Sequence, residues 1–170
     1  GFSTVHFAYN SPEDARIYTL DLPADYDLMA SPQAKLKKYS YDDLQVVELS
    51  KGNINKRLYR GHPCGKKITE LFGDSLNFDF SPYYGKMDFI FIDGDHTYEG
   101  VKKDFELIQP LCHQHTIIGF HDIHAVKAPG VDEYWGELVN NQIIMPIADI
   151  HAVDANISLG IGVAKLKMRL

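Results

Sequence analysis

The sequence has few cysteines and no long apolar run, and each shortage excludes a class of protein. Cys64 and Cys112 are the two cysteines in 170 residues, too few for a disulfide framework and typical of a reducing, cytoplasmic setting. No apolar run reaches the roughly 20 residues that a membrane-spanning helix needs. Internal repeats and a complete GxGxxG motif are also missing, which argues against a repeat array and a dinucleotide-binding enzyme.

Basic residues are outnumbered by acidic ones. Seventeen lysines and arginines stand against 23 aspartates and glutamates, so the net charge is -6. Unspecific nucleic-acid binding needs a basic surface that replaces counterions, so we expect no nucleic-acid partner. With 45% hydrophobic residues the chain can bury an ordinary globular core, and we expect a single domain over residues 1–170.

Short β-rich runs alternate with helical patterns along the chain. Strands are predicted at Arg16–Asp21, Lys67–Leu71, Met87–Asp93, Thr116–His121 and Gly160–Leu166. Helices are predicted at Thr4–Ala8, Tyr98–Leu111 and Gly130–Asn140. The less regular segment Ala24–Pro63 is expected to hold a helix and a mobile cover loop. Strands that alternate with helices predict an α/β fold with a mainly parallel sheet.

Carboxylates stand at the ends of four predicted strands. Asp21, Asp74, Asp93 and Asp122 follow or close these strands. In parallel sheets, ligands bind just beyond the carboxyl ends of the strands, where a carboxylate needs water, a donor or a cation. Aspartate also favours turns, so a ligand site and plain turn chemistry are both open interpretations.

Five stretches carry a family resemblance over nearly the whole chain. In order they are Gly1–Thr4, Arg16–Asp21, Phe72–Ser75, Phe91–Glu99 and Gly119–Ile123. They resemble class I S-adenosylmethionine-dependent methyltransferases, in the small-molecule O-methyltransferase branch with cephalosporin hydroxylase-like and macrocin O-methyltransferase-like enzymes. The resemblance implies a Rossmann-like sheet with helices on both faces and a final antiparallel strand. The family's first strand would lie upstream of Gly1, so we expect an N-terminally incomplete domain.

The resemblance also assigns residues to the cofactor. Asp21 would accept hydrogen bonds from both ribose hydroxyls, because its two oxygens match two neighbouring donors. The alternative is a turn residue before Pro23. Asp74 would meet the adenine amine, or would simply belong to a Gly-Asp turn. The cofactor set that the resemblance implies is Gly1, Ser3, Thr4, Asp21, Asp74, Ser75 and Asp93.

The candidate catalytic and metal-binding residues follow the third and fourth predicted strands. By resemblance, His96 is the general base, Asp93 is a second catalytic residue, and Asp93, His121 and Asp122 hold a divalent metal, Mg or Mn. The metal would bind the acceptor hydroxyl and lower its pKa. An imidazole ligand suits Mn better than Mg, and a site without metal is the open alternative. His96 could instead cap the following helix.

The sequence thus predicts S-adenosylmethionine-dependent methyl transfer to a hydroxyl of a small molecule, a sugar or natural product. The alternative is a degenerate, non-catalytic methyltransferase-like module for binding or assembly. A metal-dependent phosphoesterase would need further metal-spaced His and Asp residues, which the sequence lacks. We expect a small hydroxylated acceptor, no membrane partner and a homodimer.

Overall fold

The computed structural model describes residues 1–27, 56–154 and 157–167, apart from the side chains of 152–159. The chain forms two compact units, Gly1–Phe78 and Asp79–Leu170. The single domain expected from the sequence stays a prediction. The predicted helix and cover loop in Ala24–Pro63 fall mostly on 28–55, outside the described residues.

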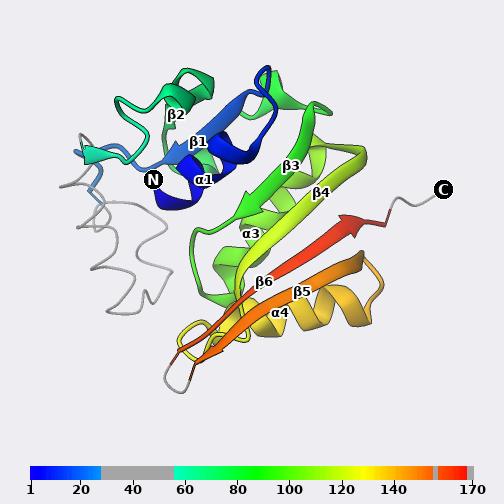
Figure 1. Cartoon of the computed structure of the whole chain (residues 1–170). Coiled ribbons are helices and arrows are strands. Elements are labelled where there is room, and N and C mark those ends of the chain that lie inside the picture. Colours follow the sequence, from blue (N-terminus) through cyan, green and yellow to red (C-terminus); the bar gives the residue numbers. More distant parts are fainter. Residues whose placement is uncertain (28–55, 155–156, 168–170) are drawn as a thin grey trace. The chain divides into compact units, whose positions relative to one another are not determined.

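The N-terminal unit is built on two parallel strands. Strand β1 (Ile17–Asp21) pairs in register with β2 (Ile68–Phe72), and helix α1 (Phe2–Asn10) lies against β1 (Figure 1). The parallel pairing brings the carboxyl ends of both strands to one edge. A 3₁₀ helix at Pro63–Lys67 leads into β2, and another at Ser75–Asn77 follows it.

A lysine ties helix α1 to the segment before β2. Lys67 Nζ donates hydrogen bonds to the carbonyls of Ala8 and Ser11, each at 2.8 Å. The last carbonyls of a helix have no partner within the helix, so a cation there satisfies them and suits the helix dipole. This contact fixes the end of α1 although 56 residues separate Lys67 from Ser11.

The C-terminal unit holds a four-stranded sheet in the order β3-β4-β6-β5 (Figure 1). Its strands are β3 (Met87–Ile92), β4 (Cys112–Ile123), β5 (Ile144–Asp154) and β6 (Ile157–Leu166). Strands β3 and β4 are parallel, and β6 is antiparallel to both its neighbours. The sequence did not predict β5. It is an edge strand interrupted by Pro146, and proline weakens a strand pattern while being tolerated at an edge.

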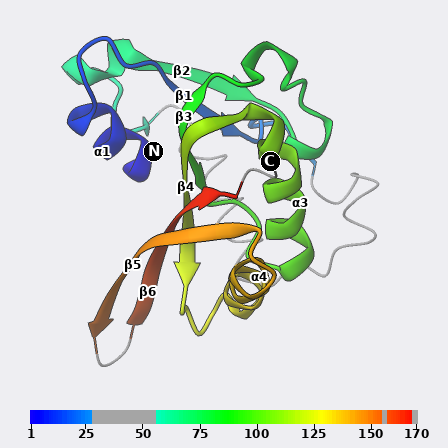
Figure 2. The same cartoon turned by 90° about the vertical axis from the view of Figure 1, so that its right-hand side faces the viewer.

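Two helices cover one face of this sheet. Helix α3 (Tyr98–Ile108) and helix α4 (Pro129–Asn140) lie side by side on it (Figure 2). The Phe120 ring of β4 contacts Phe105 of α3 and Trp135 of α4, with ring centroids 5.8 and 5.2 Å apart. Short 3₁₀ helices at Ser81–Tyr83 and Gln109–Leu111 flank β3 and α3.

The predicted α/β class is confirmed, and the predicted strands and helices appear at their expected places. Strand β4 begins at Cys112, four residues before the predicted start. Thr116 explains the extension, since its hydroxyl donates to the carbonyl of Met87 and accepts from the amide of His113. In the described part of the chain, the helices are too short or too polar to cross a membrane.

The buried aromatic core predicts that substitutions of two phenylalanines have different effects on the free energy of unfolding. Phe105 is 1% exposed, whereas Phe89 on β3 is 42% exposed. Phe105→Ala should lower the free energy of unfolding by about 3–5 kcal/mol, because it opens a cavity between α3 and β4. Phe89→Ala is the matched control and should cost far less. Urea denaturation measures both, and equal losses would contradict this assignment of the core.

Candidate functional site

The register between β3 and β4 brings charged side chains together at their carboxyl ends. Ile92 pairs with Phe120, so the next residues, Asp93 and His121, become neighbours. His121 Nδ1 lies 3.2 Å from Asp93 Oδ1. The Phe91 ring packs edge-on against the imidazole, with centroids 5.8 Å apart. Two residues of the predicted site therefore meet because of strand pairing alone.

A bulge in β4 adds Asp122 to the same cluster. The ladder between β4 and β6 shifts register between His121 and Ile123, and Asp122 has a φ of 63°. Successive residues of a regular strand face opposite sides of the sheet. Here His121 Nδ1 and Asp122 Oδ1 lie only 3.1 Å apart. A left-handed backbone costs roughly 1–3 kcal/mol outside glycine, and such strain gathers at functional sites.

The loop between β3 and α3 contributes His96. His96 Nε2 lies 3.0 Å from Asp122 Oδ2. The loop is ordered by its neighbours, since Asp95 accepts a hydrogen bond from the Thr97 amide and Thr97 caps α3 by accepting from the Gly100 amide. The cap of α3 is thus Thr97, which leaves the imidazole of His96 directed at Asp122.

The first turn of α4 packs against the backbone of this loop. A Cβ atom at Gly130 would lie 2.2 Å from the Tyr98 amide nitrogen and 2.9 Å from the His96 carbonyl oxygen. Only a residue without a side chain allows this approach of helix and loop. The backbone that carries His96 therefore rests on the first turn of α4.

The cluster is electrostatically coupled. The Asp122 carboxylate raises the pKa of His121 above its usual value, against the opposing effect of burial. Burial also opposes ionisation of Asp122, but the imidazoles of His121 and His96 beside it lower the pKa of this carboxyl well below its ordinary value. Asp122 is 8% exposed and ionised at neutral pH, so it can hold an imidazole or a cation.

The donor set fits a divalent cation. One ligand atom each from Asp93, His96 and Asp122 lie within 4.8 Å of one another. In the described part of the chain, the buried atoms Asp122 Oδ1 and His121 Nδ1 have no partner with hydrogen-bond geometry. Buried polar atoms without a hydrogen bond are costly, so a further ligand would suit them. The resemblance assigned the imidazole ligand to His121, which also lies beside both aspartates, and that assignment stays a prediction. The metal itself stays a prediction.

In the N-terminal unit, Asp21 ends β1 and pairs with Arg57. Arg57 Nη1 lies 2.5 Å from Asp21 Oδ2, and Arg57 Nε lies 3.3 Å from Glu70 Oε1. The Arg57 side chain is only 9% exposed. No sequence pattern indicates Arg57, because it lies 36 positions from Asp21 in a segment without a regular pattern. Arg57 orients Asp21 through one of the two carboxylate oxygens.

Asp74 follows β2 and caps the short helix after it. Its Oδ1 accepts from the Leu76 amide at 3.0 Å, and its Oδ2 accepts from the Tyr26 hydroxyl at 2.8 Å. The Leu76 contact is that of a capping turn residue, whereas the Tyr26 contact joins residues 48 positions apart. Because Gly73 donates to the Asp21 carbonyl, Asp21 and Asp74 share one edge of the two-stranded sheet.

The predicted cofactor residues Gly1, Ser3 and Thr4 lie at the start of α1. Gly1 is the N-cap, while Ser3 and Thr4 belong to the first turn, whose amides lack helical partners. A Cβ atom at Gly1 would lie 3.1 Å from the Tyr59 ring and 3.5 Å from Arg57 Cβ. Gly1 and Asp21 therefore both adjoin Arg57. Ser75 lies directly after Asp74, at the start of its 3₁₀ helix.

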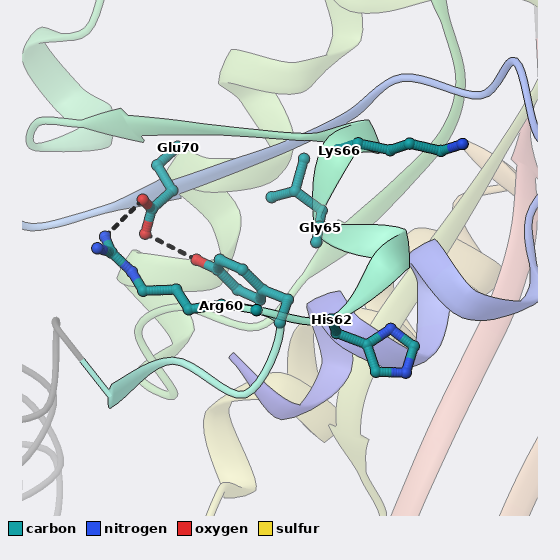
Figure 3. A pocket seen from close by; sticks show the side chains of 8 residues that line it. Arg60, His62, Gly65, Lys66 and Glu70 are labelled. Atoms are coloured by element: carbon teal, nitrogen blue, oxygen red, sulfur yellow. Dashed lines mark hydrogen bonds and ion pairs between the residues drawn. The ribbon is translucent and has the colours of Figure 1, made fainter.

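A hollow of about 400 Å³ opens beside β2 (Figure 3). Glu70 accepts from the Tyr59 hydroxyl at 2.9 Å and from Arg60 at 2.7 Å. Burial and this hydrogen bond raise the pKa of Tyr59 to about 12, so it remains a donor. The residues that line the hollow are Tyr59, Arg60, Gly61, His62, Gly65, Lys66, Ile68 and Glu70. Through Arg57, this network supports Asp21.

Known structures share this fold. A Klebsiella pneumoniae protein assigned as an O-methyltransferase is 15% identical with a TM-score of 0.63, covering 99% of this chain and 69% of its own. TomG from Streptomyces achromogenes, an O-methyltransferase of tomaymycin synthesis solved with SAM, is 15% identical (TM-score 0.59; 99% and 69% covered). A Bacillus cereus O-methyltransferase in complex with SAH is 16% identical (TM-score 0.59; 98% and 70%).

At these identities the structures establish the fold alone. No curated protein matches the chain. The profile of the methyltransferase domain family matches residues 1–123, which include both carboxylate-bearing sheet edges. The resemblance read from the sequence is thereby confirmed, and the chain belongs to the methyltransferase domain family.

Proposed function

We propose that this protein transfers a methyl group from S-adenosylmethionine to a hydroxyl of a small molecule. The observation that carries the proposal is the contact of His96 Nε2 with the Asp122 carboxylate at 3.0 Å, at the carboxyl ends of two parallel strands. A base held by a carboxylate, in the region of the sheet where α/β enzymes bind ligands, is the arrangement that acid–base catalysis needs.

His96 is the proposed general base. Its side chain is 30% exposed, so an acceptor hydroxyl can approach it, while Asp122 fixes its ring. When bound, the cofactor supplies an electrophilic methyl group. His96 would take the proton of the acceptor hydroxyl as the carbon–oxygen bond forms and the methyl–sulfur bond breaks, which leaves S-adenosylhomocysteine. Asp122 would stabilise the resulting imidazolium. A sugar or natural product is the proposed acceptor class. The homodimer and the cytoplasmic setting expected from the sequence stay predictions.

The cofactor is proposed to bind through the sheet edge that carries Asp21. Asp21 keeps its second carboxylate oxygen for ribose hydroxyls while Arg57 holds the first. The first turn of α1 offers backbone amides to the methionine end of the cofactor. Asp74 and Ser75 are proposed to face the adenine, and the assignment of Asp93 to the cofactor stays a prediction of the resemblance.

A divalent metal is proposed to assist the reaction. Asp93, His96 and Asp122 would hold it, with His121 as the alternative imidazole ligand. Mixed carboxylate and imidazole donors favour Mn over Mg. When bound, the metal would lower the pKa of the acceptor hydroxyl and orient it. His96 cannot serve as base and ligand at the same moment, so a metal held by His121 leaves His96 as the base.

The cofactor assignment predicts the effect of one substitution. Wild-type protein should bind S-adenosylhomocysteine in the micromolar range, measured by isothermal titration calorimetry. Asp21→Asn should weaken binding about 10- to 100-fold, because hydrogen bonds to a charged group contribute roughly 1.5–3 kcal/mol. Asp25→Asn, at an exposed carboxylate shortly after the same strand, is the matched control and should bind like wild type.

Thermal unfolding of both variants shows whether the loss of the Arg57 contact has disturbed the fold. If folded Asp21→Asn binds S-adenosylhomocysteine as tightly as wild type, Asp21 does not belong to the cofactor site. If wild-type protein does not bind S-adenosylhomocysteine at all, the enzyme proposal fails and the non-catalytic binding or assembly module is favoured.

The metal assignment predicts a selective loss of Mn²⁺ affinity. Calorimetric titration with MnCl₂ should show binding to wild type that Asp122→Asn weakens at least about tenfold, since a ligand carboxylate is lost. Asp88→Asn removes the same charge from an almost fully exposed carboxylate on β3 and should leave the affinity unchanged. Equal losses in the two variants would point to unspecific attraction rather than a site.

The two histidines can be separated in the same titration. His96→Gln and His121→Gln each remove one imidazole from the cluster. The variant that loses Mn²⁺ affinity identifies the nitrogen ligand. If both variants bind Mn²⁺ like wild type, the metal takes no imidazole, and the proposed donor set is wrong.

A further inference from the structure

A second histidine–carboxylate cluster lies just beyond the strained end of β4. His124 has a φ of 62°, so it is left-handed like Asp122 two residues earlier. Two such residues so close together each cost roughly 1–3 kcal/mol, and they persist only where their surroundings over-determine the backbone. The turn that carries Asp122 therefore needs an external restraint.

His124 supplies contacts to two other elements. Its amide donates to Asp132 Oδ1 at 3.1 Å, and its Nδ1 lies 3.1 Å from the same oxygen. Its Nε2 lies 2.8 Å from Asp149 Oδ2. Asp132 belongs to the first turn of α4 and Asp149 to β5, so the imidazole links the turn to both.

The cluster has a further neighbour on β5. His151 Nδ1 lies 3.4 Å from Asp149 Oδ1, and its ring meets the His124 ring edge-on with centroids 5.7 Å apart. All four side chains are 40–46% exposed. Single exposed ion pairs contribute little to stability. Here His124 makes three such contacts, two with Asp132 and one with Asp149. Together they restrict the conformation of the turn.

We propose that His124, bridged between Asp132 and Asp149, is a positioning residue that holds Asp122 against His96 and His121. This inference rests on the proposed function, because it assigns the bridge a part in organising the base. Without the bridge, the 122–124 turn would relax towards ordinary backbone angles. The Asp122 carboxylate would then turn away from the two imidazoles.

The test uses the histidine ring nitrogens as reporters. Long-range ¹H–¹⁵N spectra of ¹⁵N-labelled protein at one fixed pH detect the ring nitrogens of His96 and His121, assigned with His96→Gln and His121→Gln. The spectrum of Asp122→Asn gives the chemical shifts of these nitrogens when the carboxylate is lost. His124→Ala removes both side-chain contacts and keeps a non-glycine residue at the left-handed position, so the strain remains. Asp149→Asn keeps the imidazole but weakens one end of the bridge.

We expect His124→Ala and Asp149→Asn to shift the ring-nitrogen signals of His96 and His121 at least halfway towards their chemical shifts in Asp122→Asn. His113→Ala is the matched control, because it removes a histidine–aspartate pair of 3.1 Å at the other end of β4. It should leave the reporters at their wild-type positions. If the ring nitrogens keep their wild-type chemical shifts in either bridge variant, the proposal is wrong, even if the variant melts at a lower temperature.

Binding of S-adenosylhomocysteine by the same variants keeps this test apart from the proposed function. The bridge variants should bind it like wild type, because most of the proposed cofactor residues belong to the N-terminal unit. If wild-type protein does not bind it, the proposed function fails, and the ring-nitrogen spectra still decide whether His124 positions Asp122.

Discussion

The parallel pairing of β3 with β4 is the constraint on which the candidate site depends. It places the first residue after β3 next to the last residues of β4, so Asp93 meets His121 without any contribution from loops. Side-chain packing of α3 and α4 on the other side of these strands holds the register, through the contacts of Phe120 with Phe105 and Trp135. The hydrophobic core and the charged cluster are thus two consequences of one pairing.

Strain and support are combined at the end of β4. The bulge at Asp122 lets two adjacent residues serve the same cluster, which regular strand geometry forbids. The backbone cost of its left-handed conformation has to be offset by packing around it. Helix α4 contributes twice, because Gly130 supports the loop that carries His96 and Asp132 contacts His124. The first turn of α4, which begins at Pro129 shortly after Asp122, thereby contacts both the His96 loop and the turn at His124.

In the N-terminal unit, the contacts of Arg57 organise the edge of the two-stranded sheet. This buried cation contacts Asp21 and Glu70, and Gly1 adjoins it, so one side chain organises the edge of the two-stranded sheet. A charge that is so little exposed must be paired to be tolerated. Asp74, by contrast, caps a short helix and accepts hydrogen bonds through both of its carboxylate oxygens.

Sequence by itself determined the elements and the family. Apolar runs such as Phe89–Ile92 predict strands, helical spacing predicts α3, and the motif order around Asp21, Asp93 and Asp122 indicates a methyltransferase. These features are local, because periodicity and turn chemistry act over a few residues. Strand β5 escaped prediction since its edge position and its Pro146 obscure the pattern.

Only the tertiary structure decided which side chains meet. The pairing of Arg57 with Asp21, the convergence of His96 on Asp122 and the bridge from His124 to Asp149 join residues 25–36 positions apart. Likewise, a bulge in β4 that no local pattern marks brings Asp122 beside both His96 and His121. Such contacts follow from strand register and helix packing, which depend on the whole core rather than on any one segment.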